Sequence, residues 1–188
     1  YTVTYTIAPT GGCGVLTTTA PVTITLLPIA AFSYAGTPYC SDGANPLPTY
    51  SGGGVAGVFS STAGLVFVNT GTGQVNVSAS TAGTYTVTNT IAPAGGCGIA
   101  SATSPITVTA LPTAAISYTG SPWCSDAGLQ NVTLVGTGGG TYSAPAGLSI
   151  NVATGTITPS ASAPGTYTVT YTIAAAGGCG IIIATTSV

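Results

Sequence analysis

Apolar and polar residues alternate strictly along one stretch of this chain that occurs three times. In the third copy, which begins at Tyr167, Tyr, Val, Tyr and Ile fill one set of alternate positions and Thr fills the other. Side chains of a β-strand point to opposite faces in turn, so this period of two predicts a strand with one buried face. The Ala-Ala-Gly-Gly that follows predicts a flexible turn before Cys179. Each copy is therefore expected to form a strand that runs into a hairpin.

The copies follow one another at a nearly constant spacing, which is typical of an array of one small module. They begin at Tyr1, Tyr85 and Tyr167. A Leu-Pro pair recurs at the spacing of the first two copies, and we place the module boundaries at this pair. Because this link is short and contains proline, a stiff rod is expected. The predicted organisation is the end of a truncated module over 1–26, a module over 27–110, and a module over 111–188 that lacks the end of its last strand.

Shorter alternating runs bounded by Gly and Pro predict the remaining strands. In the first hairpin the returning strand is expected over Val15–Leu26, and in the second module the first strand is expected near Ile29–Ala35. Seven short strands in about 80 residues, as in the third module, are typical of an immunoglobulin-like sandwich. The predicted fold class is all-β, with tandem immunoglobulin-like β-sandwich modules of about 83 residues. The strands expected in the third module lie near residues 116–118, 130–135, 140–144, 147–151, 155–159, 165–173 and 180–188.

Composition excludes several classes of function. The chain has no Lys, Arg or His, and its only acidic residues are Asp42 and Asp126. Nucleic-acid binding and attachment to anionic lipid both depend on Lys and Arg, so neither partner is expected. No apolar run reaches the roughly 18 residues needed to span a bilayer, so no membrane insertion is expected. General acid–base catalysis needs titratable groups close together, and we expect neither an enzyme nor a cofactor.

The two aspartates occupy the same position in successive modules, because each follows a Cys-Ser pair. One carboxylate per module is well short of the oxygen-rich cage that calcium requires, so no metal site is expected. We expect each carboxylate to accept hydrogen bonds from the backbone of its own turn.

The five cysteines fall into two periodic classes. Cys13, Cys97 and Cys179 end Gly-Gly-Cys hairpins, whereas Cys40 and Cys124 begin Cys-Ser-Asp turns. One cysteine of each class per module predicts structural disulfides and an oxidising compartment, and hence an extracellular or cell-surface location. Without a His to generate a thiolate, nucleophilic thiol chemistry is not expected.

Two disulfide pairings remain open, and free thiols are the third alternative. Within-module bonds Cys40–Cys97 and Cys124–Cys179 would close loops of similar length, each contributing about 4 kcal/mol by chain entropy. In an immunoglobulin-like sandwich, however, this turn and this hairpin lie at opposite ends, beyond the roughly 7 Å that a disulfide permits between Cα atoms. Successive modules would bring the turn of one near the hairpin of the next, which predicts Cys40–Cys179 and leaves the outer cysteines to other modules or chains.

Four aromatic residues occupy two repeated positions. Tyr85 and Tyr167 follow Gly-Thr at the start of the repeated strand. They are interpreted either as a stacking platform for sugars or as core tyrosines whose hydroxyls bond to a nearby loop, and we favour the core interpretation. Tyr39 and Trp123 precede the turn cysteines and are expected to pack at a module junction or a subunit contact.

Two polar patterns bear on the surface. Asn76 and Asn131 begin Asn-x-Ser/Thr sequons, which makes both candidate N-glycosylation sites. The Thr rows of the repeated strands suit an ordinary outward strand face better than an ice- or crystal-binding array, because each module supplies only one row on a twisted sheet.

The third module carries a resemblance to known repeats. Residues 147–173 read GLSINVATGTITPSASAPGTYTVTYTI, which resembles a G-L-x-[IV]-x-x-x-T-G-x-[IV] hairpin followed by G-T-Y in bacterial surface proteins. With the Cys-Ser-Asp turn and the Gly-Gly-Cys hairpin, the chain is similar to the tandem Ig-like or PKD-like repeats of giant secreted Bacteroidetes surface proteins, of adhesin or filament type. The second module departs from this motif, since Gly64-Leu65-Val66-Phe67 stands at the hairpin position.

The resemblance implies a cell-surface or extracellular fibre built from many such modules. With 1% charged residues, little repulsion keeps copies of the chain apart, so the surface is expected to be masked by glycans or covered in an assembly. The leading hypothesis is a non-enzymatic structural repeat region of an extracellular bacterial filament or giant adhesin, with modules stacked end to end and self-association as the main interaction. The alternative is an adhesin module that binds a carbohydrate or a surface, with surface glycans as its partner.

Overall fold

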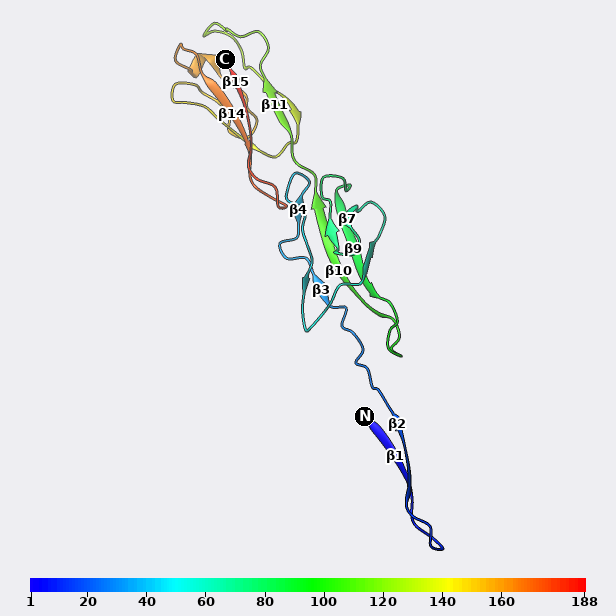
Figure 1. Ribbon diagram of the computed structural model, residues 1–188. Helices are drawn as coiled ribbons and strands as arrows, with labels where there is room; N and C mark the ends of the chain where they lie inside the picture. Colours follow the sequence, from blue (N-terminus) through cyan, green and yellow to red (C-terminus); the bar gives the residue numbers. More distant parts are fainter.

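The computed structural model describes all 188 residues, from Tyr1 to Val188, as an elongated chain (Figure 1). It contains fifteen strands, one 3-10 turn (η1, Pro159–Ala161) and no α-helix, which confirms the predicted all-β class. A two-stranded hairpin lies at one end, and residues 27–110 and 111–188 follow it in order along the long axis.

The first hairpin consists of β1 (Thr2–Ile7) and β2 (Leu16–Pro21), which pair antiparallel along their whole length. Every residue of both strands is exposed, including Val3 at 58% and Tyr5 at 64%. The residues that correspond to Val3 and Tyr5 in the other two copies are buried, at 0% or 1% exposed: Val87, Asn89, Val169 and Tyr171. The hairpin therefore presents a core face that nothing in this chain covers.

The second module holds a four-stranded sheet in the order β4-β10-β9-β6 and two short ribbons, β3–β5 and β7–β8. All of these pairs are antiparallel except β4 with β10, which is parallel. The elements are β3 (Phe32–Ser33), β4 (Tyr39–Cys40), β5 (Thr49–Tyr50), β6 (Val58–Ser61), β7 (Phe67–Asn69), β8 (Gln74–Val75), β9 (Gly83–Ile91) and β10 (Ala100–Thr109).

The core of this module is formed by the inward residues of β9, which the alternation predicts, by inward residues of β10, and by aromatic residues on and near β3 and β6. Val87 and Ile106 are both 0% exposed. Phe59 packs edge-on against Phe32, with ring centroids 5.2 Å apart. The ten buried residues of this cluster are Phe32, Tyr34, Phe59, Leu65, Val75, Val77, Tyr85, Val87, Ile106 and Val108.

The third module has the same plan with fewer regular strands. Strands β13, β14 and β15 form one sheet, and β11 pairs with β12. Its core is a separate cluster of Ile116, Tyr142, Ile157, Val169 and Tyr171. The elements are β11 (Ala114–Ser117), β12 (Thr133–Gly136), β13 (Thr141–Ser143), β14 (Thr168–Ile173) and β15 (Ile182–Ser187).

Two of the seven strands expected in the third module are not regular strands. In 147–151 and 155–159 the only bridged residues are Ile150 and Ile157, which bridge to each other, and Ile157 also bridges to Gln130. The Asn151 side chain accepts hydrogen bonds from the backbone of the two residues at 153 and 154. The segment is therefore a tight hairpin in which these side-chain bonds add to a few backbone bonds, such as the one from the Asn151 N–H to the Thr156 carbonyl at 2.9 Å.

Two other predicted strands are shorter than expected. The first strand of the second module covers only Phe32–Ser33, because its partner turns away at Gly52 and Gly53, whose φ angles are +60° and +82°. The returning strand of the first hairpin ends at Pro21, and the residues after it cross to the next module.

The raised pKa values of two tyrosines predict how the free energy of unfolding changes at alkaline pH. The Tyr34 hydroxyl donates a 2.5 Å hydrogen bond to the Gly73 carbonyl, and the Tyr118 hydroxyl donates to the Gly155 carbonyl. Burial raises the pKa of Tyr34 above its ordinary value and raises the pKa of Tyr118 to about 12. Because the folded state then holds protons that the unfolded state releases, stability should stay constant up to about pH 10 and fall as pH rises further.

Urea unfolding at a series of alkaline pH values, followed by circular dichroism, measures this effect. The Tyr118→Phe variant removes one of the tyrosines whose pKa is raised in the folded state, so its curve should fall less steeply with pH. A midpoint that does not change while the tyrosine absorbance titrates would contradict the prediction.

Candidate functional site at the junction of modules

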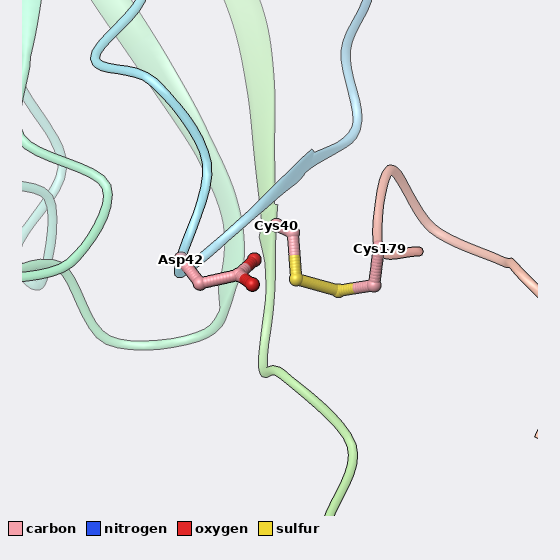
Figure 2. Close-up of side chains that lie close together, drawn as sticks. All are labelled: Cys40, Asp42 and Cys179. Carbon is pink, nitrogen blue, oxygen red and sulfur yellow. A yellow bond between two sulfur atoms is a disulfide. The ribbon is translucent and has the colours of Figure 1, made fainter. Parts of the chain in front are cut away.

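A disulfide joins the second module to the third. Cys40 and Cys179 are bonded across a sequence separation of 139, with Cα atoms 4.7 Å apart (Figure 2). Both residues are buried, at 3% and 4% exposed. Of the two pairings that the sequence left open, the structure forms the one between neighbouring modules.

The cysteine of the second module is held by the last strand of its own module. Tyr39 and Cys40 form β4, which pairs parallel with Val108 and Thr109 at the end of β10. The next residue, Ser41, donates its backbone N–H to the Thr109 carbonyl at 2.9 Å. Its hydroxyl oxygen accepts the backbone N–H of residue 111 at 3.0 Å, so the turn is tied to the strand end and to the link between the modules.

The partner cysteine lies in a hairpin that is pressed against this turn. Gly177 and Gly178 have φ angles of +60° and +81°, a conformation that glycine adopts without strain. A Cβ on Gly177 would lie 2.9 Å from the Thr109 side chain, and a Cβ on Gly178 would overlap the Pro38 carbonyl oxygen. The Gly-Gly pair is therefore required because the third module approaches the backbone of the second so closely.

Asp42 lies beside the disulfide, and the three residues form the one cluster of possible metal ligands in the structure (Figure 2). The disulfide uses both sulfur atoms of Cys40 and Cys179, which leaves a single exposed carboxylate. One carboxylate cannot form a calcium cage. The site is therefore a structural crosslink and offers no set of donors for a metal.

The turn around each aspartate is closed by backbone bonds, which corrects the sequence prediction. Gly43 donates to the Cys40 carbonyl at 2.9 Å, and Ala127 donates to the Cys124 carbonyl at 3.0 Å. Neither Asp42 nor Asp126 accepts a hydrogen bond. Both side chains are exposed, so water competes with the turn backbone for their oxygens.

The other three cysteines are free. Cys13 and Cys124 are exposed, and Cys97 is partly buried. The within-module bonds do not form because β4 faces the third module, whereas the β9–β10 connection that carries Cys97 faces the first hairpin (Figure 1).

The hydroxyls of the repeated tyrosines, Tyr85 and Tyr167, donate hydrogen bonds to backbone carbonyls. The Tyr85 hydroxyl donates to the Thr81 carbonyl at 2.6 Å, and the Tyr167 hydroxyl donates to the Ala163 carbonyl at 2.8 Å. Both are bonds to a nearby loop, as a core tyrosine makes, but only Tyr85 is buried in the core, at 7% exposed, whereas Tyr167 is partly buried and its bond is exposed.

The second pair of aromatics also bonds to the backbone four residues earlier. Tyr39 donates its hydroxyl to the Ala35 carbonyl, and Trp123 donates Nε1 to the Thr119 carbonyl at 3.2 Å. Only Tyr39 lies at a junction between two modules, in β4 beside the Cys40–Cys179 disulfide. Trp123 instead packs edge-on against Tyr118, with ring centroids 6.0 Å apart.

A cavity of about 270 Å³ lies beside Trp123, Tyr167 and Val188. This volume lies just below the roughly 300 to 1,000 Å³ of typical ligand pockets, so it gives little support to a sugar-binding site.

The two sequon asparagines differ in accessibility. Asn131 is exposed, and its side-chain oxygen accepts a hydrogen bond from the Thr156 hydroxyl at 3.2 Å. Asn76 is partly buried, and its side-chain oxygen accepts bonds from the Ser78 hydroxyl and the Ala79 N–H. The side-chain nitrogen of each asparagine makes no hydrogen bond, and that of Asn131 is the more accessible for a glycan.

Sequence reasoning did not single out Ser41 and Thr109, on which this junction depends. A signal was present, because Thr25 recurs as Thr109 at the module spacing, two positions before each Leu-Pro pair. No protein-family model matches the sequence, and a search of curated proteins finds no significant relative. The structure contains no helix of the length and apolar character needed to cross a membrane.

Proposed function

We propose that this chain is a structural repeat region of an extracellular bacterial filament or giant cell-surface adhesin, without enzymatic activity. Its modules are immunoglobulin-like sandwiches stacked end to end. The observation that carries the proposal is the disulfide Cys40–Cys179, which fastens one module to the next instead of closing either module on itself. A protein whose task is to transmit tension or maintain length gains from such a bond, whereas a free binding domain does not need one.

The rest of the chain supports this proposal. Only the short link 110–113 separates β10 from β11, so the modules have little freedom to move apart. The disulfide fits an oxidising compartment. The two aspartates lie in separate modules and share no site with another titratable partner, which favours a structural role over catalysis.

The strand surfaces support self-association as the main interaction. The edge strand β6 exposes Val58 at 64%, and β15 exposes Ile183 at 63%. The chain has no Lys to place on such edges, although charged side chains are the usual means of blocking edge-to-edge pairing. Uncharged edges of this kind favour lateral contact between rods.

Negative-stain electron microscopy of the native material tests the proposal. The expected result is filaments or long rods whose axial repeat equals one module. A glycan array run on the same preparation should show no selective ligand. Dispersed compact particles under non-denaturing conditions would contradict the proposed function.

A further inference from the structure

The first hairpin meets the second module through the same contact that joins the second module to the third. Thr25 corresponds to Thr109, and Gly95 corresponds to Gly177. A Cβ on Gly95 would lie 3.0 Å from the Thr25 side chain, and a Cβ on Gly177 would lie 2.9 Å from the Thr109 side chain. The sulfur of Cys97 lies 3.5 Å from the Thr25 carbonyl oxygen. Two of the three segments of the disulfide-bonded junction are therefore already assembled here.

The third segment, the Cys-Ser-Asp turn, has no counterpart at this contact. Where the junction is complete, β4 covers the end of β10, and Val108 is 1% exposed. The corresponding residue of the first hairpin, Ile24, is 71% exposed, and no strand pairs with Ile24 and Thr25. Cys97, which corresponds to the bonded Cys179, is free.

We propose that Ile24, Thr25 and the hairpin of Cys97 form a binding site for one further aromatic-Cys-Ser-Asp turn, and that Cys97 bonds to the cysteine of that turn. Because β4 pairs with the last strand of its own module, the occupant is the turn of the module that ends in the first hairpin. That turn would be encoded before Tyr1 in a longer protein. The inference rests on the proposed function, since it needs an array in which every junction is crosslinked.

Formation of the bond is an oxidation of two thiols. The Cys97 thiol and the thiol of the turn lose two protons and two electrons in forming one S–S bond. A small-molecule or protein disulfide, such as oxidised glutathione, accepts them and is reduced to two thiols by exchange through a mixed disulfide. Sulfur, protons and electrons balance without any other reactant.

A peptide with the sequence of residues 36–43, GTPYCSDG, tests this inference on the 188-residue chain in the presence of oxidised glutathione. Cys13 is a built-in control, because it ends the same kind of Gly-Gly-Cys hairpin but nothing lies within 4 Å of a Cβ on Gly11 or Gly12. Chymotrypsin and mass spectrometry then locate the attached peptide, since the chain has no Lys or Arg for trypsin. We expect Cys97 to be labelled about tenfold more than Cys13, because docking raises the effective concentration of the peptide thiol.

A peptide of the same composition in scrambled order should lose this preference. Equal labelling of the two cysteines by GTPYCSDG would overturn the proposal. A predominant Cys97–Cys124 disulfide between two copies, formed without peptide, would overturn the assigned occupant and give the site to a second chain. The electron microscopy of native material is independent of these results, so a failure here leaves the proposed function standing.

Discussion

Replacing Asn89 with leucine is expected to lower the free energy of unfolding of the second module by about 3 kcal/mol. The side chain is 0% exposed in the middle of β9. Its Nδ2 donates to the carbonyls of Ala30 and Val55, both at 2.9 Å, and its Oδ1 accepts the backbone N–H of Gly57 at 2.7 Å. Leucine would leave these three backbone groups without this partner, one in a buried bond and two in part-buried bonds, and a buried group left unpaired costs about 1 to 3 kcal/mol.

Hydrogen exchange under increasing urea measures this effect locally, through the protection of β9 and β10. Trp123, the one tryptophan, lies in the third module and reports through its fluorescence whether the loss is confined to the second. Thr86→Leu is the matched control, because Thr86 lies on the exposed face of the same strand. If both variants lose the same small amount of stability, the three hydrogen bonds do not hold the module together as inferred.

The position of Asn89 also shows what alternation predicts and what it leaves out. The period of two correctly places Val87 and Val169 in cores, both at 0% exposed. It does not explain why one copy has Asn89 where the next has Tyr171. Both side chains bond to backbone groups that lack a strand partner, since the Tyr171 hydroxyl accepts the Gly140 N–H and donates to the Thr137 carbonyl. These backbone groups are distant in sequence, so the local pattern does not reveal them.

The first hairpin shows that pattern alone does not bury a residue. Tyr1, Val3, Tyr5 and Ile7 repeat the apolar face of the other two copies, yet all four are exposed. Alternation indicates which face of a strand suits a core. Whether that face is covered depends on other strands, and none in this chain packs against it.

Strand lengths were predicted least well, because they depend on partners. The Phe32–Ser33 strand ends where its partner turns at Gly52, a feature of a different segment. The disulfide was more accessible to sequence reasoning, because the argument used topology: a turn and a hairpin at opposite ends of one module cannot meet. That argument pointed to Cys40–Cys179 but was outweighed in the sequence prediction, which gave more weight to the within-module bonds Cys40–Cys97 and Cys124–Cys179.

Removing the disulfide is expected to loosen the rod at one point while leaving both modules folded. The core clusters of the two modules share no residue, so neither depends on the bond for its packing. In the Cys40→Ser and Cys179→Ser double variant, the junction keeps the short link 110–113, its bond to Ser41, and the contact of the hairpin with Pro38 and Thr109. Small-angle X-ray scattering should then show a broader distribution of shapes, and exchange should rise at the hairpin before Cys179.

The free cysteines provide the matched control for this prediction. A triple variant with serine at Cys13, Cys97 and Cys124 keeps the junction disulfide and should scatter as the original chain does. Disulfides typically contribute about 2 to 4 kcal/mol, which is large beside the few contacts that remain at the junction. Unchanged scattering in the double variant would mean that the close fit of Gly177 and Gly178 against the second module fixes the angle between modules unaided. The bond would then add resistance to pulling without setting the shape of the rod.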